Sequence, residues 1–113
     1  MPFLNKEQEY GNIEYKLHLN NISDDKIIKY STQMNFRLNE GNGLVFYIIG
    51  IKDNGCITGL NKINIEESIN NLKKIANSLY PLEIKYEIFQ INKKKYFSIV
   101  KLINKNHKKI LIF

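Results

Sequence analysis

The stretch LVFYIIGI, Leu44 to Ile51, is a continuous apolar run near the middle of the chain. It is too short for a typical helix and rich in β-branched and aromatic residues, which favours a strand. A strand without alternating polar positions is typical of the centre of a sheet, where both faces are covered. We therefore expect this run to be a central strand, and the other elements are placed around it.

The chain after this strand predicts a tight turn, a short strand and a helix. The pair Asn54-Gly55 is the strongest two-residue hairpin signal, and it leads into the short strand CITGL, Cys56 to Leu60. A helix is expected from about Ile65 to Leu79, with Asn64 as its N-cap. Apolar residues recur in it at helical spacing, which predicts one buried stripe: Ile65, Ile69, Leu72, Ala76 and Leu79.

The chain before this strand predicts a half-buried strand and a first helix. From Ile13 to Leu19, apolar and polar residues alternate, which is the period-two pattern of a strand with one face in solvent. Glu14, Lys16 and His18 would then share the polar face. Ser23 is the expected N-cap of a helix that continues until the glycines of NEGNG.

The last third of the chain alternates like a series of antiparallel strands separated by Asn/Lys turns. The expected strands cover about residues 84–88, 96–103 and 110–113. The element order is then β-α-β-β-α-β-β-β, with two helices against a mostly antiparallel sheet, which is the α+β class. A chain of 113 residues with 43% hydrophobic residues has the size and apolar content of one core, so residues 1–113 are expected to form a single domain.

Positive charge is concentrated in two turns of this last third, and the chain has a formal net charge of +6. The candidate RNA-binding lysines are Lys93, Lys94, Lys95, Lys105, Lys108 and Lys109. With Tyr96 and Phe97 they could form an RNA-binding surface, because bases stack on exposed aromatic rings while lysines hold phosphates. The alternative interpretation is two solvated turns whose neighbouring aromatic residues belong to the core.

The sequence contains no apolar run of the roughly 18 residues that a membrane span requires, and its start lacks the apolar stretch of a secretory signal. The single cysteine, Cys56, cannot form an internal disulfide, as is usual in a reducing compartment. We therefore expect a cytoplasmic protein with no membrane partner.

Two segments together resemble a known family: GNIEYKLHL, Gly11 to Leu19, and TQMNFRLNEGNGLVFYIIGIKDNGCITGL, Thr32 to Leu60. They are similar to the N-terminal domain that precedes the GTPase domain in the translational GTPases called GTP-binding protein one and two, relatives of elongation factor one-alpha. The resemblance implies a non-catalytic accessory domain whose partners are its own GTPase domain and RNA or the ribosome. The segment KKILIF looks like the first strand of that GTPase domain, so the resemblance also implies that residues 1–113 are a fragment of a longer protein.

The residues that bind GTP in this family do not occur in this sequence. A P-loop has the pattern G-x-x-x-x-G-K-[ST], and the chain contains neither Gly-Lys-Ser nor Gly-Lys-Thr. The nearest match to the guanine-reading tetrad Asn-Lys-x-Asp is NKNH, Asn104 to His107, which ends in histidine. We therefore expect no cofactor in this chain, and the resemblance implies that GTP and Mg²⁺ bind only to the GTPase domain.

The same segments also resemble, more distantly, the nucleic-acid-binding domains of Schlafen-type proteins, in which a strand with E-x-x-x-x-E-[FY]-K is followed by an IG-x-x-D strand. Glu9, Glu14 and Asp53 match the acids of these motifs. The three acids are similar to those that bind the metal ion for RNA cleavage in Schlafen nucleases. The resemblance therefore implies an alternative function, a metal-dependent endoribonuclease with Glu9, Glu14 and Asp53 as catalytic residues. The other interpretation expects no metal and a structural charge network, in which Lys16 and Lys52 neutralise the acids.

Overall fold

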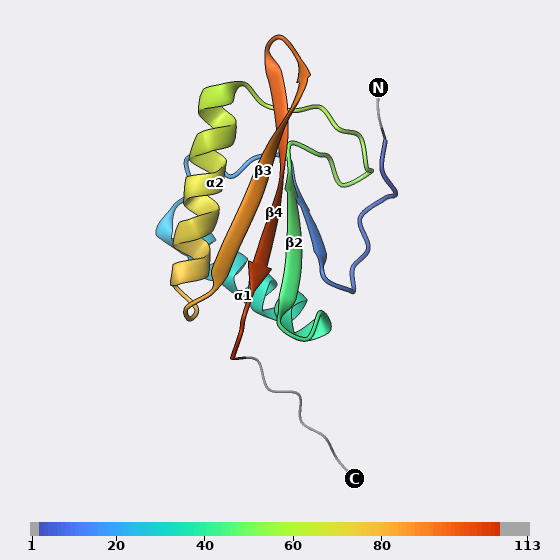
Figure 1. Ribbon diagram of the computed structural model, residues 1–113. Coiled ribbons are helices and arrows are strands. Elements are labelled where there is room, and N and C mark those ends of the chain that lie inside the picture. The colour runs from blue at the N-terminus through green and yellow to red at the C-terminus, as the bar shows by residue number, and fades with distance from the viewer. Residues whose placement is uncertain (1–2, 107–113) are drawn as a thin grey trace.

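A computed structural model describes residues 3–106 of the protein, which form two helices and four strands (Figure 1). Along the chain they are β1 (Ile13–Lys16), α1 (Asp24–Glu40), β2 (Leu44–Ile49), α2 (Lys62–Asn77), β3 (Glu83–Asn92) and β4 (Lys95–Ile103). The sheet has the order β1-β2-β4-β3, with β1 parallel to β2 and the other two pairs antiparallel. The predicted α+β class with a mostly antiparallel sheet is therefore confirmed.

The central strand of the prediction is β2, which lies between β1 and β4. Every second side chain points to the face that the helices cover, and Val45, Tyr47 and Ile49 are fully buried there. They pack with apolar residues from α1, α2 and β4: Met34, Leu38, Ile65, Leu72, Ile75, Val100 and Leu102. This layer is the main hydrophobic core, because all of these residues lose nearly all contact with water.

A smaller apolar cluster lies on the opposite face of the sheet. It contains Tyr15 of β1, Ile48 of β2, and Ile51 and Ile57 from the loop between β2 and α2. Phe97 of β4 packs against it. The loop after β2 therefore covers part of the face that has no helix.

Side chains at the helix starts satisfy backbone N–H groups that have no partner within the helix. The hydroxyl of Ser23 accepts a hydrogen bond from the Lys26 amide at 3.3 Å, so the predicted N-cap of α1 is confirmed. The N-cap of α2 is Asn61, whose side chain accepts from the Asn64 amide at 2.8 Å. Asn64 lies inside the first turn, and α2 begins three residues earlier than the apolar stripe indicated.

The expected short strand Cys56 to Leu60 is not a regular strand. It makes only isolated bridges, which join Ile51 to Ile57, Phe3 to Cys56 and Leu60 to Tyr96. The amides of Thr58 and Gly59 both donate to the Gly50 carbonyl, at 3.0 and 2.9 Å, so the backbone curls around Gly50 instead of extending. The expected strand at residues 110–113 lies outside the described residues.

The prediction that the polar face of β1 lies in solvent is wrong for Glu14. Glu14 is only 7% exposed and lies on the helix-covered side, whereas Ile13 and Leu17 remain 45% and 41% exposed. In the parallel register Glu14 lies beside Tyr47 of the main core. Alternation shows which residues share a face, and here a charged partner from α1 allows Glu14 on the polar face to be as buried as Tyr15 on the other.

Candidate functional site

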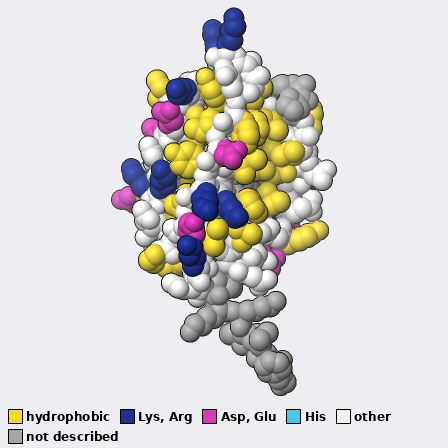
Figure 2. All heavy atoms as spheres, in the orientation of Figure 1, with side chains coloured by type: hydrophobic (Ala, Val, Ile, Leu, Met, Phe, Trp, Pro, Cys, Tyr) yellow, Lys and Arg dark blue, Asp and Glu magenta, His cyan; other side chains and the backbone are white. Residues whose placement is uncertain are grey.

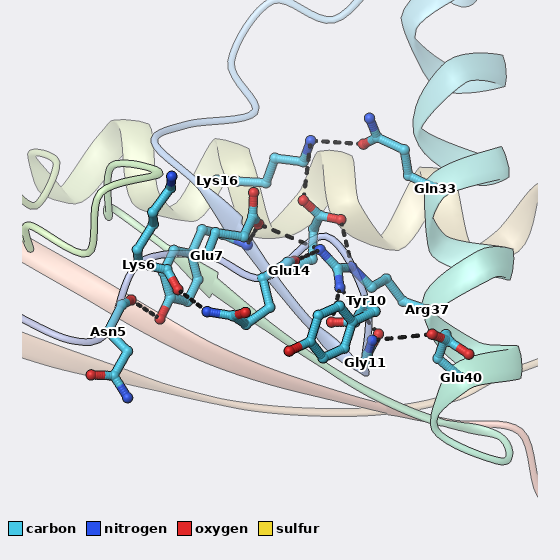
Figure 3. Close-up of polar contacts among 12 residues, drawn as sticks. Asn5, Lys6, Glu7, Tyr10, Gly11, Glu14, Lys16, Gln33, Arg37 and Glu40 are labelled. Atoms are coloured by element: carbon cyan, nitrogen blue, oxygen red, sulfur yellow. Dashed lines mark hydrogen bonds and ion pairs between the residues drawn. The ribbon is translucent and has the colours of Figure 1, made fainter.

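Arg37 of α1 lies at the centre of a buried charge cluster (Figure 3). Its side chain is 5% exposed, and its Nε donates to Glu14 Oε1 at 3.0 Å. Nη1 donates to the carbonyls of Tyr10 and Gly11 at 2.8 and 3.1 Å, and Nη2 donates to the Gln8 carbonyl at 2.7 Å. A buried guanidinium needs partners for its donors, and these four hydrogen bonds give each of its three nitrogen atoms at least one.

The segment before β1 is held against the edge of the sheet by this cluster and by its own backbone. Its Leu4 and Glu7 amides donate to the carbonyls of Gly55 and Asp53 at 2.7 and 2.8 Å. The Glu7 carboxylate accepts from the Tyr15 amide of β1, so it takes the place of a neighbouring strand. At Gly11 the chain reverses with φ +88°, a conformation that favours glycine.

The surroundings of Glu7, which include Glu14, favour the protonated form of its carboxyl group. Burial, the hydrogen bond with Glu14 and the negative charges of Glu14 and Asp53 raise the pKa of Glu7 to about 7, while the Tyr15 amide opposes the rise. The Arg37 Nη2 atom is 3.9 Å from Glu7 Oε2, at the limit of an ion pair. Near neutral pH, Glu7 is therefore protonated in a large fraction of molecules.

Lys16 closes the solvent side of the cluster. Its Nζ lies 4.0 Å from Glu14 Oε2, donates to Gln33 Oε1 at 2.8 Å and stands 4.2 Å from the centre of the Tyr30 ring. Burial lowers the pKa of Lys16, and the charge of Glu14 opposes that change. Glu14 therefore has two cationic neighbours, Arg37 and Lys16, where Lys16 and Lys52 were expected.

Of the three acids in the alternative nuclease site, Glu14 and Asp53 line one hollow, and Glu9 and Glu14 line another. Glu7, and not Glu9, lies beside Asp53. The segment before β1 runs alongside β1 in the opposite direction, and the chain then reverses to enter the strand. Glu7, Glu14 and Asp53 are among the residues that line a hollow of about 370 Å³. Within residues 3–106, no three His, Cys, Asp or Glu side chains are grouped so that they could hold a metal ion.

Arg37 is the central residue of the cluster that sequence reasoning missed. It is the only arginine in a chain with 17 Lys and Arg residues, and that isolation was the available signal. The planar guanidinium directs several donors at once, so it can bind one carboxylate and several carbonyls. The compact ammonium group of a lysine does not provide this geometry.

The candidate RNA-binding lysines fall into two separate groups. Lys93, Lys94 and Lys95 are exposed at the tip of the β3–β4 hairpin, which projects at the top of Figure 1 and carries the uppermost basic side chains in Figure 2. Lys105 is exposed at the other end of β4, where its Nζ is 3.0 Å from Glu83 Oε2. The nine residues of β4 separate the two groups by about 30 Å. Lys108 and Lys109 lie outside the described residues.

The aromatic residues beside the hairpin tip are partly buried. Tyr96 packs against the main core, and Phe97 packs against the smaller cluster and stacks on Phe89 with ring centres 5.0 Å apart. The core interpretation of these rings therefore fits the structure better than an open stacking surface. Of the described helices, neither is long and apolar enough to cross a membrane.

Comparisons with known proteins connect this chain to GTP-binding proteins. No protein-family model matches it. It is 42% identical over 78 residues to GTP-binding protein 2 of Mus musculus and, equally, of Homo sapiens; each match covers 69% of this chain and 13% of the relative. It is also 38% identical over 72 residues to an uncharacterized protein of Acanthamoeba polyphaga mimivirus, with 63% of this chain and 39% of that protein covered. The matches thus span a small part of each relative, and they support a relationship with the GTP-binding protein family through one domain of a GTPase-related protein.

Proposed function

We propose that this chain is a non-catalytic accessory domain of an elongation-factor-like translational GTPase, and that the tip of its β3–β4 hairpin contacts RNA. The observation that carries the first part is the 42% identity to GTP-binding protein 2 over 78 residues. The sequence adds that the chain has no P-loop of its own. In this proposal, GTP and Mg²⁺ bind to a GTPase domain that is the partner of this one, in the cytoplasm.

The hairpin tip supports the second part of the proposal. Lys93, Lys94 and Lys95 are consecutive and exposed, and the Asn92 side chain orders their turn by accepting from the Lys94 amide at 2.9 Å. Within residues 3–106, these three lysines form no ion pair, whereas Lys16, Lys85 and Lys105 do. Three charges on a projecting turn can approach a phosphate backbone and release its counterions.

The test compares two variants with the same charge change. Lys93→Glu/Lys94→Glu/Lys95→Glu removes the tip charge, and Lys26→Glu/Lys29→Glu/Lys62→Glu makes the same change at exposed helix positions. Each triple substitution lowers the formal net charge by six, from +6 to zero. Binding of a fluorescently labelled RNA hairpin is followed by anisotropy at several salt concentrations.

We expect the tip variant to bind at least about tenfold more weakly at low salt, with a salt slope smaller by about three, because each phosphate contact contributes close to one. The helix variant should keep most of the affinity. Equal losses in both variants would mean that only net charge matters, and wild-type affinity in the tip variant would exclude the tip as the contact.

A further inference from the structure

β3 is an edge strand, and no other strand among the described residues pairs with its outer side. The sheet order places it at the border, and within residues 3–106 it pairs only with β4. The four residues from Lys85 to Ile88 are all exposed, and Tyr86 and Ile88 keep 46% and 39% of their surface in solvent. No proline interrupts β3, and its one register shift lies near its end, between Gln90 and Asn92. The free backbone groups of such an edge are a template for another strand.

The side chains along this edge have a self-complementary order. Tyr86 is the centre of this order. The residues next to it are Lys85 and Glu87, which carry opposite charges, and the residues after those are Ile84 and Ile88. Ile84, Tyr86 and Ile88 lie on the helix-covered face, and Lys85 and Glu87 lie on the opposite face. The same sequence read in the reverse direction therefore places Lys85 against Glu87 and Glu87 against Lys85.

We propose that β3 pairs antiparallel with β3 of a second copy of this chain, about a two-fold axis at Tyr86. Lys85 then lies opposite Glu87 of the second copy, and the symmetry repeats this pair. On the other face, Ile84 lies opposite Ile88 of the second copy. Opposite charges and apolar residues directly across from each other both stabilise an antiparallel pair, and the two sheets join into one.

Neighbouring symmetric registers are disfavoured by charge. An axis at Lys85 would place Lys85 opposite itself and Glu83 opposite Glu87, and an axis at Glu87 would place that carboxylate opposite itself. Like charges directly opposite each other destabilise strand pairing. The charges therefore select the axis at Tyr86.

Hollows on both faces of β3 are available to the second copy. A hollow of about 240 Å³ lies between α2 and β3, lined by Glu66, Ile69, Asn70, Tyr86 and Ile88. A second hollow, of about 370 Å³, has Phe89 and Ile99 among its lining residues. On the face shown in Figure 2, apolar side chains gather at the centre with acidic and basic side chains among them. Pairing along β3 would remove Tyr86 and Ile88 from water.

Sedimentation of the full chain over concentrations up to about 1 mM tests this pairing, because a dimer with a Kd up to that order is then substantially populated. We expect a monomer–dimer equilibrium in the wild-type chain. Lys85→Glu and Glu87→Lys should each raise the dimer Kd at least about tenfold, because each creates two like-charge pairs across the axis. Lys29→Glu, on the exposed side of α1, is the control and should leave the Kd unchanged.

Mixing the two single variants separates this register from any other use of the edge. The Lys85→Glu variant has two glutamates at these positions, and the Glu87→Lys variant has two lysines. A heterodimer of the two variants therefore forms both opposite-charge pairs, so the mixture should form heterodimers with near wild-type Kd. The double variant Lys85→Glu/Glu87→Lys should also dimerise. A monomeric wild-type chain at every concentration, single variants that dimerise normally, or a mixture that stays monomeric would each overturn the proposal.

Discussion

The two edge strands of the sheet differ in how far other parts of the described chain cover them. At the β1 edge, residues 3–12 lie along the strand, and the Glu7 carboxylate takes the Tyr15 amide that a neighbouring strand would take. At the β3 edge, the residues from Lys85 to Ile88 are all exposed. Natural sheets protect their edges against unwanted pairing, so an edge left open beside a closed one indicates a surface for interaction.

The charges near the two edges differ in the same way. At the β1 edge, Arg37 and Glu14 are bound to each other and to the backbone, and they hold the molecule together. At the far end of the β3–β4 hairpin, Lys93 to Lys95 are exposed to solvent. Glu14 of the acidic motif is thus bound within the fold, whereas the lysines of the hairpin tip are exposed.

The largest expected effect is the loss of the Arg37 guanidinium. Arg37→Met removes four hydrogen bonds and leaves Glu14 buried without its main partner, so the free energy of unfolding should fall by about 3–5 kcal/mol. Urea denaturation measures the change. Lys29→Met on the exposed side of the same helix is the matched control, with an expected change within about 0.5 kcal/mol. A loss below about 1 kcal/mol in Arg37→Met would contradict the structural role of the cluster.

A smaller effect is expected from pH. The pKa of Glu7 is about 7 in the folded chain and near its ordinary value of 4.5 when unfolded, so the folded state binds the extra proton between these values. Stability should therefore fall as pH rises from 4.5 to about 7 and then stay level with respect to this group. Because Glu7 is partly exposed, the loss should be about 1 kcal/mol.

Glu7→Gln isolates this contribution from that of other titrating groups. The amide oxygen can still accept from the Tyr15 amide, but the side chain no longer ionises. The variant should match the wild type at pH 4.5 and exceed its stability at pH 8. A constant difference between the two proteins over this range would show that Glu7 does not carry the pH dependence.

The last prediction is that the chain does not cleave RNA. Arg37 and Lys16 already neutralise Glu14, so incubation of the wild-type chain with structured RNA and Mn²⁺ should leave the RNA intact. Gel electrophoresis of the RNA gives the measurement. Turnover that disappears in Glu14→Gln and Asp53→Asn, while both variants remain folded, would instead establish the metal-dependent nuclease.

Local patterns predicted most of the fold. The apolar run of β2, the Ser23 cap of α1 and the apolar stripe of α2 each depend on neighbouring residues, which the sequence displays directly. The burial of Glu14 could not be predicted in this way, because it depends on Arg37, 23 residues further along the chain. A period-two pattern carries no information about which face of a strand receives such a partner.

The candidate site was harder to predict for a related reason. The two lysine turns were expected to contribute to one RNA-binding surface, but β4 separates Lys93–Lys95 from Lys105, which pairs with Glu83. The acidic motif pointed to Glu9, whereas the reversal at Gly11 brings Glu7 beside Asp53. Both differences come from the path of the chain in three dimensions, which spacing along the sequence does not specify.

The central claim, that the hairpin tip and not the acidic cluster meets RNA, is tested most directly by residue-resolved NMR. A ¹⁵N-labelled chain is titrated with an RNA hairpin at low salt, and amide chemical-shift changes are mapped along the sequence. We expect the changes to centre on Lys93, Lys94 and Lys95, with Glu7, Glu14 and Arg37 unchanged. Changes centred on Glu7, Glu14 and Asp53, or no changes at all, would contradict the claim.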